Sequence, residues 1–207
     1  MMNMLDYCLN AVQRNSLPDV EYRPGGILPS EMLAFISLCR EQNVTNVVES
    51  GRSLGYSTRI LAEAGFHVAS IEINPNADAD TSLKQFTNVK LHHADGVRLL
   101  PSLLQGRCAV ILDGPKGVRA LDIWESVKKH AVLGAIHDAS KRTVEGVNGS
   151  RQPIADAGAW FTDDPVYVAA TEQFDEPAWR KDYASRSEMT AHGFTLAIFR
   201  GEMWTGG

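Results

Sequence analysis

Apolar runs of strand length alternate with segments of helical spacing through the middle of the chain. The strand-like runs lie at residues 44–50, 67–73, 89–92, 108–113 and 133–138. The segments with helical spacing lie at about 57–64, 77–86, 97–104 and 117–130. This alternation predicts parallel strands joined by right-handed helical crossovers. The unbroken apolar run at 109–112 indicates a sheet covered on both faces.

The beginning of the chain is predicted to be helical. Residues 4–14 form an amphipathic helix, and a second helix opens at Ser30, a good N-cap residue. The apolar face of that second helix carries Met32, Phe35, Ile36 and Cys39. We therefore expect a helical preface over residues 1–42, followed by a sheet core over 43–207, within one domain covering 1–207.

The last part of the chain follows another pattern. Residues 166–170 and 194–199 are strand-like, and the charged segment 175–191 between them shows no strong helical signal. Two late strands without a crossover helix predict an antiparallel pair that closes one edge of the sheet.

Composition narrows the class of protein. The 207 residues are 44% hydrophobic and 22% charged, as in ordinary globular domains, and the net charge is -5. We therefore expect no nucleic-acid partner, because binding phosphates needs clustered basic residues. No apolar stretch approaches a membrane span, and the N-terminus does not resemble a signal peptide. Three widely spaced cysteines predict free thiols in a reducing cytoplasm.

Acidic side chains stand at or just beyond the ends of the five predicted strands. These are Glu49, Glu72, Asp95, Asp113 and Asp138. Ligands of open parallel sheets bind beyond the carboxyl ends of the strands, so the acids predict a binding site at that edge.

A glycine-containing turn follows the first acid. Gly51 and Gly55 flank it, and glycine lets the backbone pass close to a ligand. The G-x-x-x-G spacing matches neither the dinucleotide-binding fingerprint nor a P-loop. Taken alone, the glycines favour a plain turn from strand to helix.

Glu72 ends the second strand, where an acid commonly accepts hydrogen bonds from a ribose diol. Ile73, beside it, can pack on a purine. The alternative role for Glu72 is to cap the next helix, although Asn74 or Asn76 would serve better.

Three strings together resemble a known family. They are E-S-G-R-S-L-G-Y-S at 49–57, I-E-I-N-P at 71–75 and L-D-G-P-K at 112–116. They resemble class I S-adenosylmethionine-dependent methyltransferases, and most of all the small catechol-type O-methyltransferases. The resemblance covers residues 30–140. It implies a Rossmann-like, doubly wound α/β fold with seven strands in the order 3-2-1-4-5-7-6, strand 7 antiparallel, preceded by N-terminal helices.

The resemblance also implies a cofactor site. Gly51, Ser53, Gly55 and Ser57 would surround the methionine part of S-adenosylmethionine, in a string that also contains Glu49 and Tyr56. Glu72 would hold the ribose and Ile73 the adenine. Asp95 and Gly96 correspond to positions at the adenine edge, and Asp113 to one near the methyl donor.

Lys116 matches the lysine that the catechol-type enzymes use as general base. Burial lowers the pKa of a lysine, and a neutral amine could then take a hydroxyl proton. The alternative is an exposed lysine that opens the helix at 117.

The metal positions of that family are only partly present. Asp113 and Asp138 match two Mg²⁺ ligands, but Ala139 stands at the third position, with Ser140 and His137 beside it as substitutes. His137 would favour a softer transition metal. Whether Mg²⁺ binds stays open. We expect weak binding at most, completed by an acceptor with two adjacent oxygens.

The resemblance therefore predicts a cytoplasmic enzyme that methylates a hydroxyl of a small molecule, with no membrane partner. A homo-oligomer is compatible with this prediction. Residues 139–152 would form a lid, and the aromatic residues Trp160, Phe161, Trp179 and Tyr183 would either line a pocket or belong to the core. Two alternatives stay open: different chemistry on the same fold, as in cephalosporin-hydroxylase-like proteins, or a non-catalytic S-adenosylmethionine-binding protein.

Overall fold

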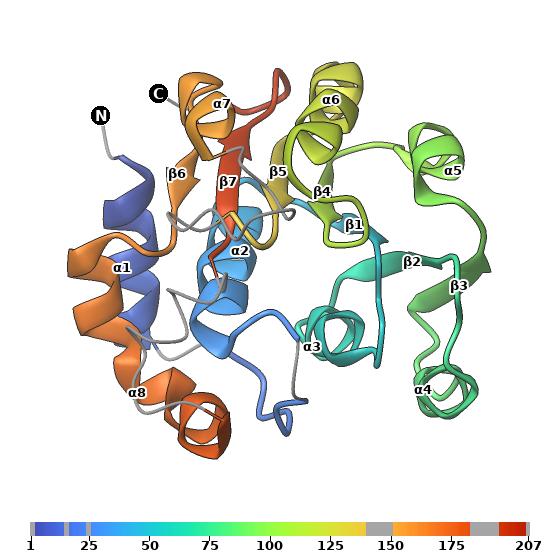
Figure 1. Cartoon of the computed structure of the whole chain (residues 1–207), viewed down its shortest axis with the longest axis horizontal. Coiled ribbons are helices and arrows are strands. Elements are labelled where there is room, and N and C mark those ends of the chain that lie inside the picture. The colour runs from blue at the N-terminus through green and yellow to red at the C-terminus, as the bar shows by residue number, and fades with distance from the viewer. Residues whose placement is uncertain (1–2, 15–16, 24–25, 140–150, 183–194, 206–207) are drawn as a thin grey trace.

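A computed structural model describes residues 3–14, 17–23, 26–139, 151–182 and 195–205 (Figure 1). Its centre is a seven-stranded sheet in the order β3-β2-β1-β4-β5-β7-β6. The strands are β1 (Asn46–Ser50), β2 (His67–Glu72), β3 (Val89–His93), β4 (Cys108–Leu112), β5 (Leu133–Ile136), β6 (Trp160–Phe161) and β7 (Ala197–Arg200). β7 runs antiparallel to β5 and β6, and the other pairs are parallel. The predicted strand order is confirmed.

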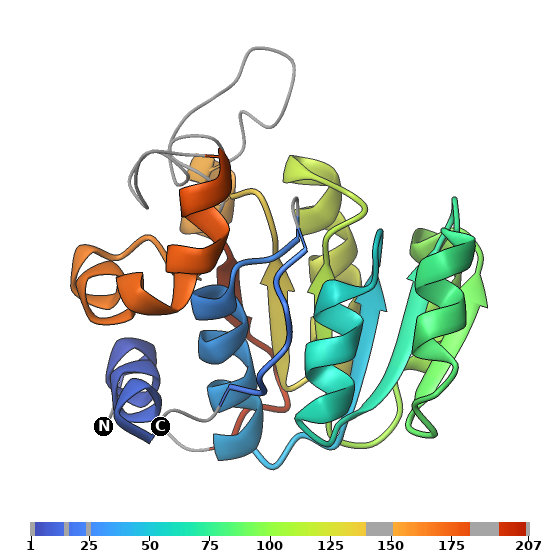
Figure 2. The same cartoon turned by 90° about the horizontal axis from the view of Figure 1, so that it is seen from below.

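Helices cover both faces of this sheet. They are α1 (Met4–Arg14), α2 (Pro29–Glu41), α3 (Tyr56–Glu63), α4 (Ala77–Leu83), α5 (Gly96–Leu103), α6 (Gly117–Val127), α7 (Arg151–Asp156) and α8 (Pro165–Asp182), with a short 3-10 turn η1 (Lys128–His130). Figures 1 and 2 show α2, α3 and α4 on one face and α5 and α6 on the other. α1 and α8 pack against α2 and against each other.

Alternation along the strands divides the core into two layers. Val47 and Ile111 belong to the layer under α2 and α3, whereas Val48, Val110 and Leu112 belong to the layer under α6. Successive side chains of a strand point to opposite faces, so β1 and β4 serve both layers. The central strands are therefore buried on both sides, as the run at 109–112 predicts.

The prediction for residues 166–170 is wrong, because they lie inside α8. Pro165 begins this helix, and the Asp164 carboxylate caps it by accepting a hydrogen bond from the Val166 N–H at 2.9 Å. Tyr167 is fully buried and its hydroxyl donates to the Ser30 carbonyl at 2.7 Å. These contacts override the strand preference of Val and Tyr, and α8 also runs into the segment where no strong helix was predicted.

The antiparallel edge pair exists, but its first strand is β6 at Trp160–Phe161. Trp160 packs edge-on against Tyr167 with ring centroids 5.4 Å apart. Among the described residues, no helix is long and apolar enough to cross a membrane.

Candidate cofactor and acceptor site

The loop after β1 approaches the loop after β4 so closely that only glycine fits. Gly51 has a φ of +95°, and a Cβ there would lie 2.2 Å from the Gly114 nitrogen. The Ser50 carbonyl accepts hydrogen bonds from the N–H groups of Asp113 and Gly114 at 2.8 and 2.7 Å. These contacts join the carboxyl ends of β1 and β4.

Glu72 is fixed by two backbone donors. Its Oε2 accepts from the Ser53 N–H at 2.9 Å, and its Oε1 accepts from the Asn74 N–H at 3.0 Å. Each carboxylate oxygen can accept a further bond, so the pair remains able to take a diol. Asn76 caps α4 through the Ala79 N–H at 2.9 Å, so Glu72 is not needed for that role.

A cleft opens at the carboxyl ends of β1, β2 and β4. The residues that line it belong to the ends of β1 and β2, to the loops after β1, β2, β3 and β4, and to the first turns of α5 and α6. They include Ser50, Gly51, Glu72, Ile73, Asp95, Gly96, Val97, Gly114, Pro115 and Arg119. Ile73 presents a 65% exposed side chain. Gly51 lies against the Gly114 backbone and Gly96 against the Ser50 side chain, so a Cβ at either position would collide with its neighbour.

These features fit the adenosine part of S-adenosylmethionine. Glu72 would take the ribose hydroxyls, Ile73 would contact one adenine face, and Asp95 and Gly96 would lie at the adenine edge. Asp95 also caps α5 through the Val97 N–H at 3.0 Å, which fixes the position of that loop.

Three residues of the string at 49–57 lie behind the loop that follows β1. Glu49 is fully buried and accepts hydrogen bonds from the hydroxyls of Ser57, Thr58 and Ser70. Burial raises the pKa of Glu49, and the three hydroxyl donors offset only part of that rise. Tyr56 is also buried, and its ring packs edge-on against Tyr22. Glu49, Tyr56 and Ser57 therefore brace the start of α3, and none of them lines the cleft.

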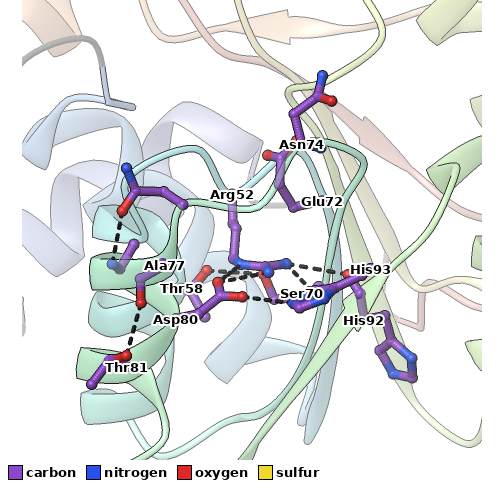
Figure 3. A network of polar contacts seen from close by, with 12 residues as sticks. Arg52, Thr58, Ser70, Glu72, Asn74, Ala77, Asp80, Thr81, His92 and His93 are labelled. Atoms are coloured by element: carbon purple, nitrogen blue, oxygen red, sulfur yellow. Dashed lines mark hydrogen bonds and ion pairs between the residues drawn. The ribbon is translucent and has the colours of Figure 1, made fainter.

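Arg52 anchors the loop from below, a role that the sequence alone did not indicate (Figure 3). Its buried guanidinium donates from Nε to Asp80 Oδ1 at 2.8 Å, and Nη2 lies 2.7 Å from the same oxygen. Nη1 donates to the carbonyls of Ser70 and His92 at 3.3 Å. His93 Nε2 contacts Asp80 Oδ2 at 2.6 Å. One side chain thus connects the loop after β1 to β2, β3 and α4.

A second group of charged side chains gathers at the ends of β4 and β5. Lys116 Nζ lies 2.5 Å from Asp113 Oδ1 and 2.6 Å from Asp138 Oδ2. Asp138 has a φ of +60°, a left-handed conformation that aspartate tolerates better than most residues. The predicted convergence of the two carboxylates is present, with an ammonium between them.

The expectation of a lysine with a lowered pKa is wrong. Burial favours the neutral amine, but the adjacent carboxylates of Asp113 and Asp138 favour the ammonium more strongly and raise the pKa of Lys116 above its ordinary value. Lys116 is therefore a cation at neutral pH in the protein without a bound acceptor.

His137 is the second cation of this group. Its Nδ1 lies 2.8 Å from Asp113 Oδ1, and its Nε2 lies 3.4 Å from Glu31 Oε2. Burial favours the neutral ring, yet Asp113 and Glu31 raise the pKa of His137 to about 10. Between them, His137 and Lys116 hold the pKa of the partly buried Asp113 carboxyl well below its usual range.

Glu31 was not predicted from the sequence. It lies in the first turn of α2, is fully buried, and accepts a hydrogen bond from the Leu28 N–H at 2.7 Å. A glutamate in the first turn of a helix signals a capping role, and that is the only signal the chain offers. Its proximity to His137 depends on the packing of α2 near the end of β5.

The charge on His137 makes stability depend on pH. A pKa raised from about 6.5 to about 10 contributes stability that is complete below pH 6.5 and is lost as the pH rises toward 10. We expect the free energy of unfolding to fall over this interval by more than ~1.4 kcal/mol, the value of one pKa unit. Urea denaturation at a series of pH values measures it.

His137→Gln should flatten this pH dependence, whereas His67→Gln, at an exposed position, should keep it. A parent protein whose free energy of unfolding stays constant from pH 6.5 to 10 would contradict a charged His137.

The residues present do not fit a Mg²⁺ ion. Asp113, His137 and Asp138 could bring three ligand atoms within 4.8 Å of one another. However, Lys116 contacts both carboxylates, and the imidazole faces Asp113 as a donor. Ala139 adds no side-chain oxygen, and Mg²⁺ prefers six oxygen ligands.

Some predicted residues fall outside this description. Ser140, most of the predicted lid and Tyr183 lie outside the described residues, as does the side chain of Trp179. The Arg151 guanidinium lies over the Phe161 ring at 3.8 Å, so Phe161 packs against α7. Trp160 lines a separate cavity with residues of α1.

The comparisons with known proteins concern the fold. No protein-family model and no curated protein sequence matches the chain. Similar solved structures include a candidate caffeoyl-CoA O-methyltransferase from Staphylococcus aureus, with 16% identity, a TM-score of 0.49, and 97% of this chain and 93% of that one covered. A SAH-bound methyltransferase from Podospora anserina shows 13% identity and a TM-score of 0.47, covering 95% and 88%.

An rRNA methylase from Streptococcus thermophilus shows 13% identity and a TM-score of 0.48, covering 88% of this chain and 98% of that one. Similarity to solved structures at such low sequence identity indicates the fold alone and does not identify a methyl acceptor. The strand order itself, with β7 antiparallel between β5 and β6, is the one expected from the three strings. By this order, the chain has the Rossmann-like fold of the class I S-adenosylmethionine-dependent methyltransferases.

Proposed function

We propose that this chain transfers a methyl group from S-adenosylmethionine to a hydroxyl of a small molecule. The observation that carries the proposal is the cleft in which Glu72, held by two backbone N–H groups, faces the glycine-lined ends of β1 and β4. Gly114 and Pro115 of that cleft directly follow Asp113 in the chain, so the charged group of β4 and β5 adjoins it. When bound, the cofactor would supply an electrophilic methyl group.

The chain's own residues would prepare the acceptor oxygen. Lys116, as an ammonium, can donate a hydrogen bond to the acceptor hydroxyl and lower its pKa. Asp138, 33% exposed, can accept the proton that the hydroxyl releases. His137 holds Asp113 in place from the buried side. This division of roles differs from a lysine general base, because the lysine starts with its proton.

Replacing Glu72 with Ala should weaken S-adenosylmethionine binding about tenfold or more. The change removes a charged acceptor for the ribose hydroxyls, and hydrogen bonds to a charged group contribute about 1.5–3 kcal/mol. Isothermal titration calorimetry with S-adenosylmethionine and S-adenosylhomocysteine measures the loss. Glu63→Ala, at the end of α3 and paired only with Arg59 among the described residues, is the matched control and should bind like the parent.

Two outcomes would count against the proposal. Equal affinity in a folded Glu72→Ala variant would reject the ribose assignment. A folded parent protein that binds neither ligand would reject the cofactor and favour a role without S-adenosylmethionine.

A further inference from the structure

The ammonium of Lys116 stands where two strand-end carboxylates would otherwise share a cation. Its Nζ lies within 2.6 Å of one oxygen from each of Asp113 and Asp138, close enough for a direct hydrogen bond to both. Without a cation, two such carboxylates would repel each other, and one would take up a proton. The lysine removes that repulsion from within the chain.

The local backbone directs Lys116 toward these carboxylates. Lys116 is the extended residue before α6, with a φ of -119°, and Gly117 behind it has a φ of +61°, in the left-handed region that favours glycine. The Lys116 side chain is only 29% exposed. Gly117 therefore allows a turn directly after Lys116, and this turn brings the Lys116 side chain to the ends of β4 and β5.

The rest of the group also suits an internal cation. His137 already contacts Asp113, and its Nδ1 lies 3.4 Å from Asp138 Oδ1. Ala139 is buried, and its N–H donates to the Thr195 carbonyl at 2.9 Å. A divalent ion would have to displace the lysine and would find two carboxylates and an imidazole, with no third oxygen side chain at position 139.

We propose that Lys116 is the built-in cation of this site and takes the place of a divalent metal ion between Asp113 and Asp138. The position of Lys116 between the two carboxylates is a property of the folded protein and does not depend on its function. Only the catalytic consequence, methyl transfer without added metal, rests on the proposed function. An acceptor would then be oriented by the ammonium, and it would not need two adjacent oxygens to chelate a metal.

Manganese binding tests this occupancy directly. Mn²⁺ favours the same oxygen ligands as Mg²⁺, and electron paramagnetic resonance reports its free concentration. We expect the full-length parent protein to bind Mn²⁺ no more tightly than about 1 mM, equivalent to about -4 kcal/mol. Lys116→Met should bind at least about tenfold more tightly, because it removes the ammonium from both carboxylates and leaves, among the described residues, only the His137 contacts at the two aspartates. Lys128→Met, which removes a more exposed lysine paired with Glu125, should behave like the parent.

Further variants make the result specific. Adding Asp138→Asn to Lys116→Met should remove the gained affinity, because one of the two carboxylates is lost. Lys116→Gln is a second replacement for the case in which the methionine variant does not fold. Micromolar Mn²⁺ binding by the parent would overturn the proposal, and so would a lack of gained binding in both folded Lys116 variants.

Failure of the proposed function would look different. If the parent protein excludes Mn²⁺ but binds no S-adenosylmethionine, the built-in cation is supported and the methyltransferase function is rejected. If the parent protein methylates an acceptor only when Mg²⁺ is added, and EDTA abolishes this activity, the methyltransferase function is supported and the built-in cation is rejected.

Discussion

Replacing Arg52 with Met is expected to lower the free energy of unfolding by about 3–5 kcal/mol. The Arg52 side chain is fully buried, and it is the guanidinium partner of Asp80, whose side chain is only 8% exposed. Removing the guanidinium takes a permanent cation from the buried Asp80 carboxylate and leaves the mostly exposed His93 ring beside it. The change also leaves the carbonyls of Ser70 and His92 without this donor. Urea or guanidinium denaturation followed by circular dichroism measures the loss.

The control for this experiment is Arg59→Met on α3. Arg59 forms a half-exposed pair with Glu63 at 3.6 Å, four residues along the same helix, so its loss should cost less than about 1 kcal/mol. The double variant Arg52→Met/Asp80→Leu should recover part of the stability, because both buried charges are then gone. Equal stabilities for the two arginine variants would show that the Arg52 contacts do not hold the loop.

Replacing Lys116 with Met is expected to lower kcat by ~10²–10⁴ while leaving the affinity for S-adenosylmethionine nearly unchanged. In the proposed function the ammonium polarises the acceptor hydroxyl; in the structure it contacts Asp113 and Asp138, and Lys116 is not among the residues that line the cleft around Glu72. Transfer of a tritiated methyl group to panels of small hydroxylated acceptors measures the rate, with EDTA present so that no metal replaces the lost charge.

Lys128→Met is again the matched control and should keep the parent rate, because Lys128 pairs with Glu125 on α6, away from the site. Lys116→Arg keeps the charge with a different geometry and should retain part of the rate. A Lys116→Met variant that methylates its acceptor at the parent rate would remove Lys116 from the mechanism.

Much of the sheet could be predicted because its signals are local. The five parallel strands were placed within two residues at each end, since apolar runs bounded by glycine, asparagine and acidic residues identify buried strands well. The gathering of Glu72 and Asp95 around one cleft, with Asp113 next in the chain to the lining residue Gly114, follows from topology, because parallel strands carry their carboxyl ends to one edge.

The rest depends on contacts between distant parts of the chain. Residues 166–170 have strand-forming side chains, and only the Asp164 cap and the burial of Tyr167 against α2 make them helical. Arg52 and Glu31 look like surface residues in the sequence, yet both are buried. Arg52 contacts Asp80 on α4, and Glu31 contacts His137 after β5, so both contacts depend on how distant segments pack. The pKa of Lys116 could not be inferred either, because its direction depends on which carboxylates face the amine.

The position of β7 has a consequence for how the protein folds during synthesis. β7 is the last strand in chain order, but it lies between β5 and β6 inside the sheet. As the chain leaves the ribosome, β1 to β5 can pair while the outer edge of β5 remains open, with its apolar residues and unpaired peptide groups exposed. That edge closes only when residues 197–200 emerge. We therefore expect nascent chains that stop before β7 to depend on chaperones and to aggregate on release.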